Sequence, residues 1–280
     1  MSSSLDHSLY RDLGIHRVLE PAGTLPQPAW KLDNTPIANA TETLVNVQKL
    51  HIDSASFTQI VHVCERDPAR IRSHIMDIIA RRGKMHNPVT GSGGVLLGTI
   101  EQLDEEYGKK HNLARGDTIV SLTSLSWLPL HLEQIHAIHL ERSEIEVTGK
   151  AIFFRSNPLA TLPADLPQAI VVAALDVAGA PARVATLVQP GQRVTVLGAG
   201  GTAGLLTLCA IRQKLGHSGQ LIAIEYSDKA LQDTATLDVA DTLLRAEAGA
   251  GDHTTRWATA GDQNYQACAP RPGCGSGDEG

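Results

Sequence analysis

A glycine-rich loop between two apolar stretches carries the most specific chemical pattern in the sequence. In VTVLGAGGTAGLL, Val194 to Leu206, small residues follow the spacing G-x-G-x-x-G/A, which is typical of dinucleotide-binding folds. The first glycine permits a tight turn, the second lets the backbone approach a pyrophosphate, and the third small residue allows close helix–strand packing. The following helix N-terminus offers free N–H groups to phosphate oxygens. The predicted cofactor-binding residues of this loop are Gly198, Gly200, Gly201, Thr202, Ala203 and Gly204.

A carboxylate lies at the end of the next apolar stretch. Glu225 closes GQLIAIE, about 20 residues beyond the loop, where an acidic side chain accepts hydrogen bonds from an adenosine ribose. Because this charge would repel a 2′-phosphate, the pattern favours NAD over NADP. We include Glu225 and its neighbour Tyr226 among the predicted cofactor-binding residues. The alternative is a glycine-rich packing turn followed by a chance acid.

A second set of polar residues stands among glycines in MHNPVTGSGGVLLGTI, Met85 to Ile100. His86 is suited to proton transfer, and Asn87 and Thr90 are suited to hydrogen bonds with a substrate. The backbone N–H groups of GSGG are suited to an anion. The candidate catalytic residues are therefore His86, Asn87, Thr90 and Ser92. The alternative is a tight structural turn that begins at Asn87-Pro88.

No group of residues has the spacing of a metal site, and we predict that no metal is bound. His86 has no cysteine or glutamate close to it in the sequence, and the four cysteines form no C-x-x-C pair. Cys209 fits an apolar helical pattern and is predicted to lie in the core. We expect the basic run RRGK, Arg81 to Lys84, to be a solvated helix end. The histidines of LPLHLEQIHAIHL are predicted to lie on the surface of an edge strand or helix: His131, His136 and His139.

The first part of the chain, residues 1–160, is predicted to be a β-rich domain. Its strands are expected in GDTIVSLTSL, EIEVTG, KAIFF and the alternating FTQIVHVCE. DPARIRSHIMDIIARRG predicts a helix in which Asp67 is the N-cap, Pro68 is the first residue and Gly83 ends the helix. The apolar stripe of this helix consists of Ile71, Ile75, Ile78 and Ile79.

Residues 161–246 are predicted to form part of a Rossmann domain. After helical pieces in LPADLPQAIVVAALDVAGAPARVATLV, the strands RVTVLG, GQLIAIE and DTLLRA alternate with two helices. Leu208, Ile211 and Leu215 form the stripe of the first of these helices, and Ser227 or Asp228 caps the second. This β-α-β-α-β order is half of a doubly wound parallel sheet, so the fold class is α/β. Residues 247–280 contain no Val, Ile, Leu, Met or Phe and are predicted to be a disordered tail.

The composition of the chain favours a globular protein over a nucleic-acid-binding or membrane-spanning one. The chain has 280 residues, 42% hydrophobic residues and a net charge of −6, which favours a packed core and disfavours nucleic-acid binding. No apolar run approaches the ~20 residues that span a bilayer, and the start lacks the pattern of a signal peptide. We therefore expect no membrane partner and a cytoplasmic location.

Several stretches together resemble L-erythro-3,5-diaminohexanoate dehydrogenase of lysine fermentation. They include HRVLEPAGTLPQPAWKLDN, IDSASFTQI, HNPVTGSGGVLLGTI, GDTIVSLTSLSWLPL and GKAIFF, and VTVLGAGGTAGLLTL is similar to the same family. The resemblance covers roughly residues 10–246. It implies a zinc-free relative of the medium-chain dehydrogenases with a GroES-like front domain, an active site between the domains, and a homodimer. It also implies NAD-dependent oxidation of 3,5-diaminohexanoate to 5-amino-3-oxohexanoate, with release of ammonia.

The substrate that the resemblance implies has one carboxylate and two amines, so its site needs carboxylates or carbonyls for the amines. Glu20 and Asp33 are further candidates for binding an amine, with ordinary surface or turn positions as the alternative. Trp30 is expected either in the core or beside the substrate. Two other functions remain open: a zinc-free oxidoreductase of the quinone or enoyl reductase type, and an inactive nucleotide-binding fragment. The departure from the family pattern near Ala246 is taken as a truncated gene or a shifted reading frame.

Overall fold

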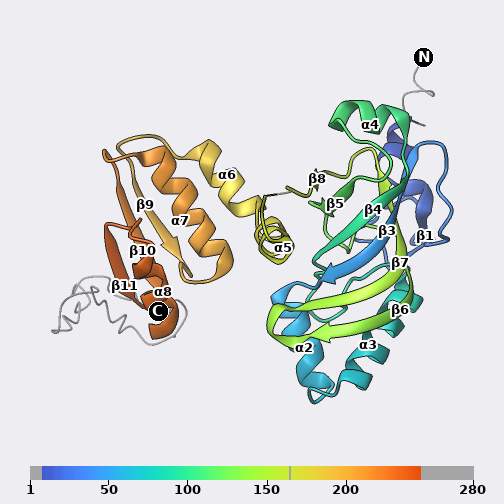
Figure 1. Ribbon diagram of the computed structural model, residues 1–280, viewed down its shortest axis with the longest axis horizontal. Coiled ribbons are helices and arrows are strands. Elements are labelled where there is room, and N and C mark those ends of the chain that lie inside the picture. Colours follow the sequence, from blue (N-terminus) through green and yellow to red (C-terminus); the bar gives the residue numbers. More distant parts are fainter. Residues whose placement is uncertain (1–7, 164, 247–280) are drawn as a thin grey trace, which may run out of the picture. The chain divides into compact units, whose positions relative to one another are not determined.

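The computed structural model describes residues 8–163 and 165–246, which form parts of two compact units, Met1–Asp176 and Val177–Gly280. The first unit contains a six-stranded sheet and the second a three-stranded sheet (Figure 1). The predicted fold class, a β-rich front part followed by an incomplete parallel α/β part, is confirmed. The predicted tail, residues 247–280, lies outside the described residues.

The sheet of the first unit is antiparallel throughout, with the strand order β6-β7-β3-β4-β5-β8. The strand predicted in GDTIVSLTSL is confirmed over Thr118–Ser121, whereas EIEVTG and KAIFF, predicted as separate strands, form one continuous strand, Glu144–Phe154. A separate strand pair, β1 and β2, follows the short 3-10 helix Ile15–Arg17. The strands are β1 (Val18–Glu20), β2 (Lys31–Leu32), β3 (Glu42–His51), β4 (Val95–Gln102), β5 (Thr118–Ser121), β6 (Leu130–His139), β7 (Glu144–Phe154) and β8 (Leu159–Thr161), and a second 3-10 turn, Leu140–Arg142, joins β6 to β7.

Helix α3 (Pro68–Arg82) forms as its sequence predicts. The carboxylate of Asp67 accepts N–H groups from Ala69 at 2.7 Å and Arg70 at 3.3 Å, and the four isoleucines of the stripe are buried. Gly83 ends the helix in the left-handed region, with φ +69°, where a residue without a Cβ has no steric penalty.

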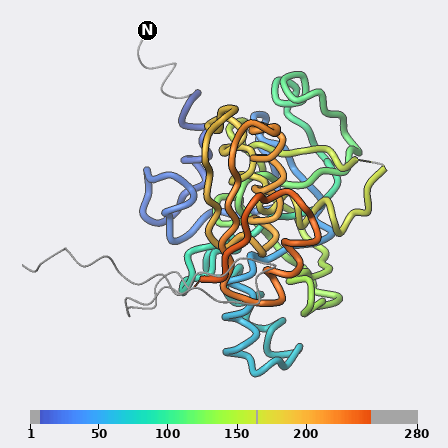
Figure 2. The backbone as a smooth tube through the Cα atoms, turned by 90° about the vertical axis from the view of Figure 1, so that its left-hand side faces the viewer, coloured from blue at the N-terminus to red at the C-terminus, as the bar shows by residue number. Residues whose placement is uncertain are grey.

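The prediction of a strand in FTQIVHVCE is wrong, because these residues belong to helix α2 (Ser54–Val63) and the turn that follows it. Asp53 caps this helix by accepting the N–H of Ser56 at 3.0 Å. Phe57, Ile60 and Cys64 are buried together, and this helical spacing outweighs the local alternation of Val61 and Val63. Figure 2 shows α2 and α3 as consecutive coils at the lower end of the tube.

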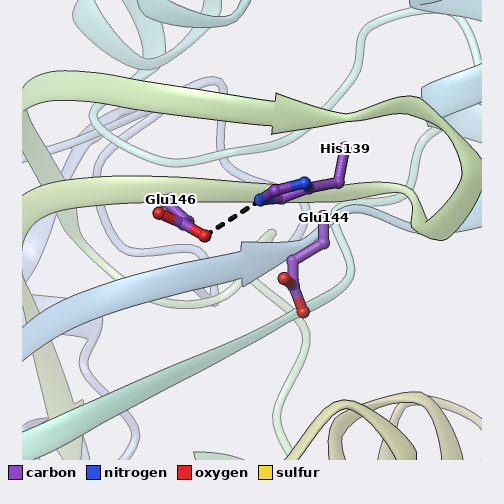
Figure 3. A group of neighbouring side chains, drawn as sticks. All are labelled: His139, Glu144 and Glu146. Atoms are coloured by element: carbon purple, nitrogen blue, oxygen red, sulfur yellow. Dashed lines mark hydrogen bonds and ion pairs between the residues drawn. The ribbon is translucent and has the colours of Figure 1, made fainter.

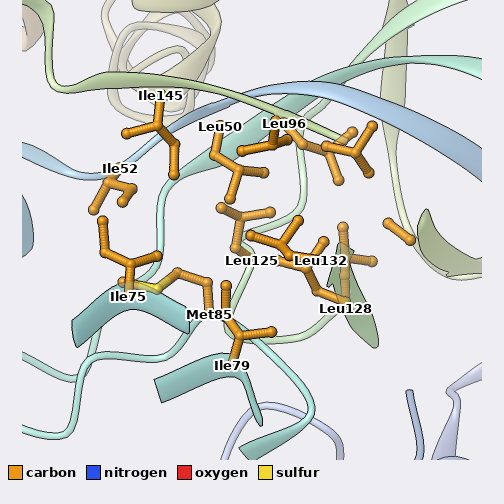
Figure 4. Close-up of a cluster of buried hydrophobic side chains, with 14 of the residues drawn as sticks. Leu50, Ile52, Ile75, Ile79, Met85, Leu96, Leu125, Leu128, Leu132 and Ile145 are labelled. Carbon is orange, nitrogen blue, oxygen red and sulfur yellow. The ribbon is translucent and has the colours of Figure 1, made fainter. Parts of the chain in front are cut away.

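The core of the first unit lies between the sheet and the helices α2 and α3. Ile75, Ile79 and Met85 pack with sheet residues such as Leu50 and Leu96 (Figure 4). Loss of a large side chain from such a core costs about 2–5 kcal/mol. Two further helices, α4 (Glu105–His111) and α5 (Gln168–Asp176), complete this unit, and Val172 of α5 joins a smaller apolar cluster on β4 and β5.

The second unit contains the predicted β-α-β-α-β segment. Its sheet is parallel, with the order β11-β10-β9, and its core includes Leu208, Ile211 and Leu215. Ser227 caps α8 by accepting the N–H of Ala230 at 3.4 Å. The elements are α6 (Gly179–Leu187), β9 (Arg193–Leu197), α7 (Thr202–Leu215), β10 (Gln220–Glu225), α8 (Asp228–Thr236) and β11 (Thr242–Arg245).

The prediction that Cys209 lies in the core is wrong. Cys209 is exposed because it follows Leu208 by about 100° around α7 and falls outside the buried stripe. Among the described residues, no single helix is long and apolar enough to cross a bilayer. The consecutive helices α5 and α6 pass that test of length and composition only when they are taken together.

Candidate active site

Asn87 anchors the glycine-rich loop of the first unit to helix α2. Its side chain is fully buried, and its amide Nδ2 donates to Gln59 Oε1 at 2.8 Å and to the Ser56 carbonyl at 3.4 Å. Its Oδ1 accepts the N–H of Val89 at 2.9 Å. The backbone N–H of Asn87 also donates to the carbonyl of Ser92 at 2.9 Å. These bonds engage both Nδ2 and Oδ1 of the Asn87 side chain, and they fix the loop beside α2.

Thr90 and Ser56 meet at this junction. Their hydroxyl oxygens are 2.5 Å apart, and Thr90 is exposed whereas Ser56 is fully buried. Gly94 follows with φ +97°, and a Cβ there would lie 2.0 Å from the His51 carbonyl. A glycine is therefore required where the loop passes the end of β3. The sequence did not identify Ser56 and Gln59 as residues of the site, because their segment was predicted to be a strand.

Two carboxylates lie beside the same end of β3. Asp53 caps α2, and Asp176 Oδ2 at the end of α5 is 3.6 Å from His51 Nε2. Burial raises the pKa of Asp176, the nearby His51 lowers it, and the charge of Asp53 raises it. A cationic ligand would relieve this repulsion between carboxylates.

His86 is half-buried and follows two buried basic residues at alternate positions. Burial, with the charges of Lys84 and Arg82, lowers the pKa of His86 to about 4. Its Nδ1 is buried without a hydrogen-bond partner among the described residues. The imidazole is therefore neutral at pH 7 and is available as a hydrogen-bonding group.

The prediction that RRGK is a solvated helix end is wrong for two of its residues. Arg81 is exposed and pairs with Asp77 at 2.7 Å, but Arg82 retains 6% of its accessible surface and Lys84 retains none. The left-handed turn at Gly83 brings the chain against β2, where a Cβ on Gly83 would lie 2.1 Å from the Leu32 carbonyl. This turn directs the residues that follow it into the protein.

Lys84 and Arg82 bind the segment before β2. The ammonium of Lys84 donates to the carbonyls of Pro26 at 2.6 Å and Gln27 at 2.8 Å. Arg82 Nε donates to the Trp30 carbonyl at 3.2 Å, and its guanidinium carbon is 4.5 Å from the centroid of the Trp30 ring. Burial, with the charge of Arg82, lowers the pKa of Lys84 to about 7.

The predicted amine-binding residues Glu20 and Asp33 lie at the end of β1 and directly after β2. Glu20 is exposed at the end of β1. Asp33 accepts bonds from the backbone and hydroxyl of Thr35 at 3.0 and 2.6 Å, and from Arg17 Nη1 at 3.3 Å. Asp33 therefore stabilises a turn, and Trp30, at 47% exposed, lies over Arg82 rather than in the core.

The histidines of LPLHLEQIHAIHL lie on β6, which is the edge strand of the sheet. His136 Nε2 is 2.7 Å from Thr148 Oγ1, and His139 Nε2 is 2.9 Å from Glu146 Oε1. Glu144 lies near this last pair (Figure 3), but its carboxylate already contacts the ammonium of Lys49 at 3.1 Å. The ammonium of Lys49 offsets part of the negative charge that would attract a metal ion. That the protein binds no metal stays a prediction.

The glycine loop of the second unit forms the predicted turn between β9 and α7. Gly198 has φ +71°, and the N–H groups of Gly198 and Ala199 donate to the Ile224 carbonyl at 2.9 and 3.1 Å. A Cβ on Gly204 would lie 2.4 Å from the Gly198 carbonyl, so close packing depends on Gly204 rather than on Ala203. Thr202 begins α7, so the N-terminal N–H groups of this helix lie at the loop.

Glu225 lies beside this loop. Its carboxylate accepts the N–H groups of Gly200 at 2.8 Å, Tyr226 at 2.8 Å and Ser227 at 3.2 Å. Burial raises the pKa of Glu225, but these three bonds outweigh it and lower the pKa overall. A Cβ on Gly200 would meet Ala230 Cβ at 2.5 Å, whereas one on Gly201 would meet nothing within 4 Å. The loop thus has an open side at Gly201 and a fixed negative charge near Gly200, a form that is typical of loops that bind a dinucleotide.

Comparison with known proteins agrees with the resemblance found in the sequence. The family model described as L-erythro-3,5-diaminohexanoate dehydrogenase N-terminal domain matches residues 16–163. The L-erythro-3,5-diaminohexanoate dehydrogenase of Acetoanaerobium sticklandii is 43% identical over 235 residues, which are 84% of this chain and 68% of that protein. The enzyme of the same name from Fusobacterium nucleatum subsp. nucleatum is 47% identical over 216 residues, which are 77% of this chain and 63% of that protein.

Among solved structures, a probable oxidoreductase from Mycobacterium abscessus is similar at a TM-score of 0.43 and 18% identity, over 77% of this chain and 56% of that chain. Relative to the two dehydrogenases named above, the chain spans about two thirds of their length. On the family match and the identities with the two enzymes, the chain belongs to the L-erythro-3,5-diaminohexanoate dehydrogenase family.

Proposed function

We propose that the protein catalyses the NAD-dependent oxidative deamination of L-erythro-3,5-diaminohexanoate to 5-amino-3-oxohexanoate. The single observation that carries this proposal is the 43% identity over 235 residues with a dehydrogenase of that name. In the reaction carbon 3, which bears the amine that is lost, is oxidised to an iminium. Water then adds to the resulting iminium, and ammonia leaves to give the ketone.

The residues of the first unit supply groups for this substrate. Asp53 and Asp176 are proposed to provide negative charge for its ammonium groups, because burial and the charge of Asp53 raise the pKa of Asp176 and a bound cation would lower it. The hydroxyl of Thr90, an exposed residue in contact with Ser56, is proposed as a hydrogen-bond donor or acceptor for the reacting amine or for water. Asn87 keeps this loop in place through α2. His86, whose lowered pKa keeps its imidazole neutral, is proposed to form a hydrogen bond in the site, and a rise of its pKa when substrate binds would be needed for it to take up a proton. Ser92 closes the loop through its backbone.

The second unit is proposed to bind the adenosine and pyrophosphate of NAD. When bound, the nicotinamide accepts the hydride. Gly198, Gly200 and Gly201 shape the loop, and the N-terminus of α7 offers N–H groups to the phosphates. The carboxylate of Glu225 is fixed by three N–H groups and would repel a 2′-phosphate, which supports NAD as the cofactor rather than NADP.

The dependence of the reverse reaction on ammonia tests the proposed function. Purified protein with NADH and 5-amino-3-oxohexanoate is expected to oxidise NADH only when ammonia is present. Oxidation of NADH by a quinone or an enoyl thioester without ammonia would instead support a reductase of another substrate class. A folded chain that turns over neither would support an inactive nucleotide-binding fragment. Homodimer formation and a cytoplasmic location stay predictions.

A further inference from the structure

Two buried cations of the first unit have no carboxylate partner among the described residues. Arg82 retains 6% of its accessible surface and Lys84 retains none, and their polar contacts are all backbone carbonyls. Buried charges in proteins are ordinarily paired, because the loss of hydration is costly. Burial lowers the pKa of Arg82, and burial together with the charge of Arg82 lowers those of Lys84 and His86. The guanidinium of Arg82 is therefore a buried positive charge that an anion would stabilise.

The hydrogen bonds of Arg82 leave one edge of its guanidinium available. Nε donates to the Trp30 carbonyl at 3.2 Å and Nη1 donates to the His86 carbonyl at 2.7 Å. Within the described residues, Nη2 has no acceptor, so its N–H groups remain for a ligand. A guanidinium nitrogen donates charge-assisted hydrogen bonds to a carboxylate.

The guanidinium of Arg82 lies over the ring of Trp30. The Trp30 ring is 4.5 Å from the guanidinium carbon and remains 47% exposed, so the stack borders solvent. Stacking on an aromatic ring restricts arginine without using its N–H groups. Lys84 fixes the preceding turn at Pro26 and Gln27, so the segment that carries Trp30 is itself held.

A short series of contacts connects Arg82 with the candidate active site. Arg82 donates to the carbonyl of His86, and the next residue, Asn87, donates to the carbonyl of Ser56. Ser56 in turn contacts Thr90 and Asp53. The guanidinium of Arg82 and the groups assigned to the reacting amine therefore belong to one connected network. We propose that Arg82, oriented by Trp30, binds the carboxylate of the amino-acid substrate; this inference rests on the proposed function.

The substitution Arg82→Gln tests the inference by steady-state kinetics. The KM for 3,5-diaminohexanoate is expected to rise about 30-fold or more, while kcat stays within about threefold, because the lost bond is a binding contact to a charged group. Arg81→Gln is the matched control, since Arg81 is adjacent and exposed and pairs with Asp77, and its KM is expected to stay unchanged. An unchanged KM for Arg82→Gln, with the control behaving as expected, would overturn the inference.

A substrate analogue provides a second test, which begins with the unmodified protein. The analogue with a carboxamide in place of the carboxylate is expected to raise the KM of the unmodified protein about 30-fold. In Arg82→Gln the same replacement is expected to have little further effect, because the two changes remove one interaction. Equal and additive effects of the replacement in both proteins would overturn the inference.

Calorimetry with 3-aminobutanoate separates this inference from the proposed function, because it measures binding without turnover. Binding that is lost in Arg82→Gln and kept in Arg81→Gln supports the carboxylate site even if the chain oxidises no diamino acid. Oxidation of the diamino acid together with equal 3-aminobutanoate binding by Arg82→Gln and the unmodified protein would overturn the carboxylate site and leave the proposed function standing.

Discussion

The two candidate binding regions are built in different ways. In the second unit, the glycine loop and Glu225 belong to two consecutive strand–helix connections and use backbone N–H groups. In the first unit, the candidate site joins the turn at Pro26 and Trp30, the start of α2 and the loop after α3. The first kind of site is encoded by local spacing, whereas the second depends on side chains that reach across the fold.

The substitution Gly204→Ala is expected to have the largest effect on the local site. Its Cβ would lie 2.4 Å from the Gly198 carbonyl, so the loop must shift, and the affinity for NAD is expected to fall about 100-fold or more. Gly179→Ala in α6 is the control, because its Cβ meets nothing within 4 Å. Calorimetric titration with NAD measures both. Normal binding by Gly204→Ala would contradict the assignment of this loop.

The substitution Glu225→Arg is expected to change the choice of cofactor. Loss of the carboxylate removes the acceptor for the ribose, and the new charge attracts a 2′-phosphate, so NAD affinity should fall roughly 10- to 100-fold while NADP affinity rises. Competition between the two nucleotides measures the ratio. Asp228→Arg is a nearby control, since Asp228 is exposed and pairs with Arg245 at 3.0 Å. An unchanged ratio in Glu225→Arg would show that Glu225 does not select the cofactor.

The substitution Asn87→Ala tests the nonlocal character of the first site. It leaves the Val89 N–H and the Gln59 amide without their partner, which is expected to cost about 1–3 kcal/mol of stability and to lower kcat about tenfold. Thr90→Val removes the contact with Ser56 but keeps the anchor, so it should lower kcat with little loss of stability. Chemical denaturation and turnover are measured on both. If Asn87→Ala has the stability and kcat of the unmodified protein, the loop is not held through α2.

The stability of the first unit is expected to depend on Lys84 and on pH. The folded pKa of this lysine is about 7 against an ordinary 10.5, so between these values the unfolded chain binds a proton that the folded chain does not. The free energy of unfolding should therefore rise with pH in this window, by on the order of 2 kcal/mol between pH 7 and pH 9. Urea denaturation at pH 7 and pH 9 measures the rise. In Lys84→Met the rise should disappear, whereas in the exposed variant Lys109→Met it should remain.

Local rules predicted the second unit well and the first unit only in part. The Asp67 cap, the isoleucine stripe and Gly83 define α3, and the glycine loop predicts its turn, because in each case the signal lies within one segment. The error at α2 arose because Val61 and Val63 alternate locally, while Asp53 caps a helix just before them.

The burial of Arg82 and Lys84 could not be predicted from the neighbouring sequence. The carbonyl that Lys84 binds at Pro26 is 58 residues away in the sequence, and the basic run looks like an ordinary helix end. Burial of these cations follows from the left-handed turn at Gly83 against Leu32, which is a tertiary contact. The same limit applies to Asn87, whose amide partners on α2 precede it by about thirty residues.

The stoichiometry of the forward reaction tests the central claim most directly. NADH and ammonia are measured in the same sample while the purified chain reacts with NAD and L-erythro-3,5-diaminohexanoate. The account predicts that both products appear at the same rate and in a one-to-one ratio, as hydride loss and hydrolysis of the iminium require. Formation of NADH without ammonia, or of neither by a folded chain that binds NAD, would contradict it.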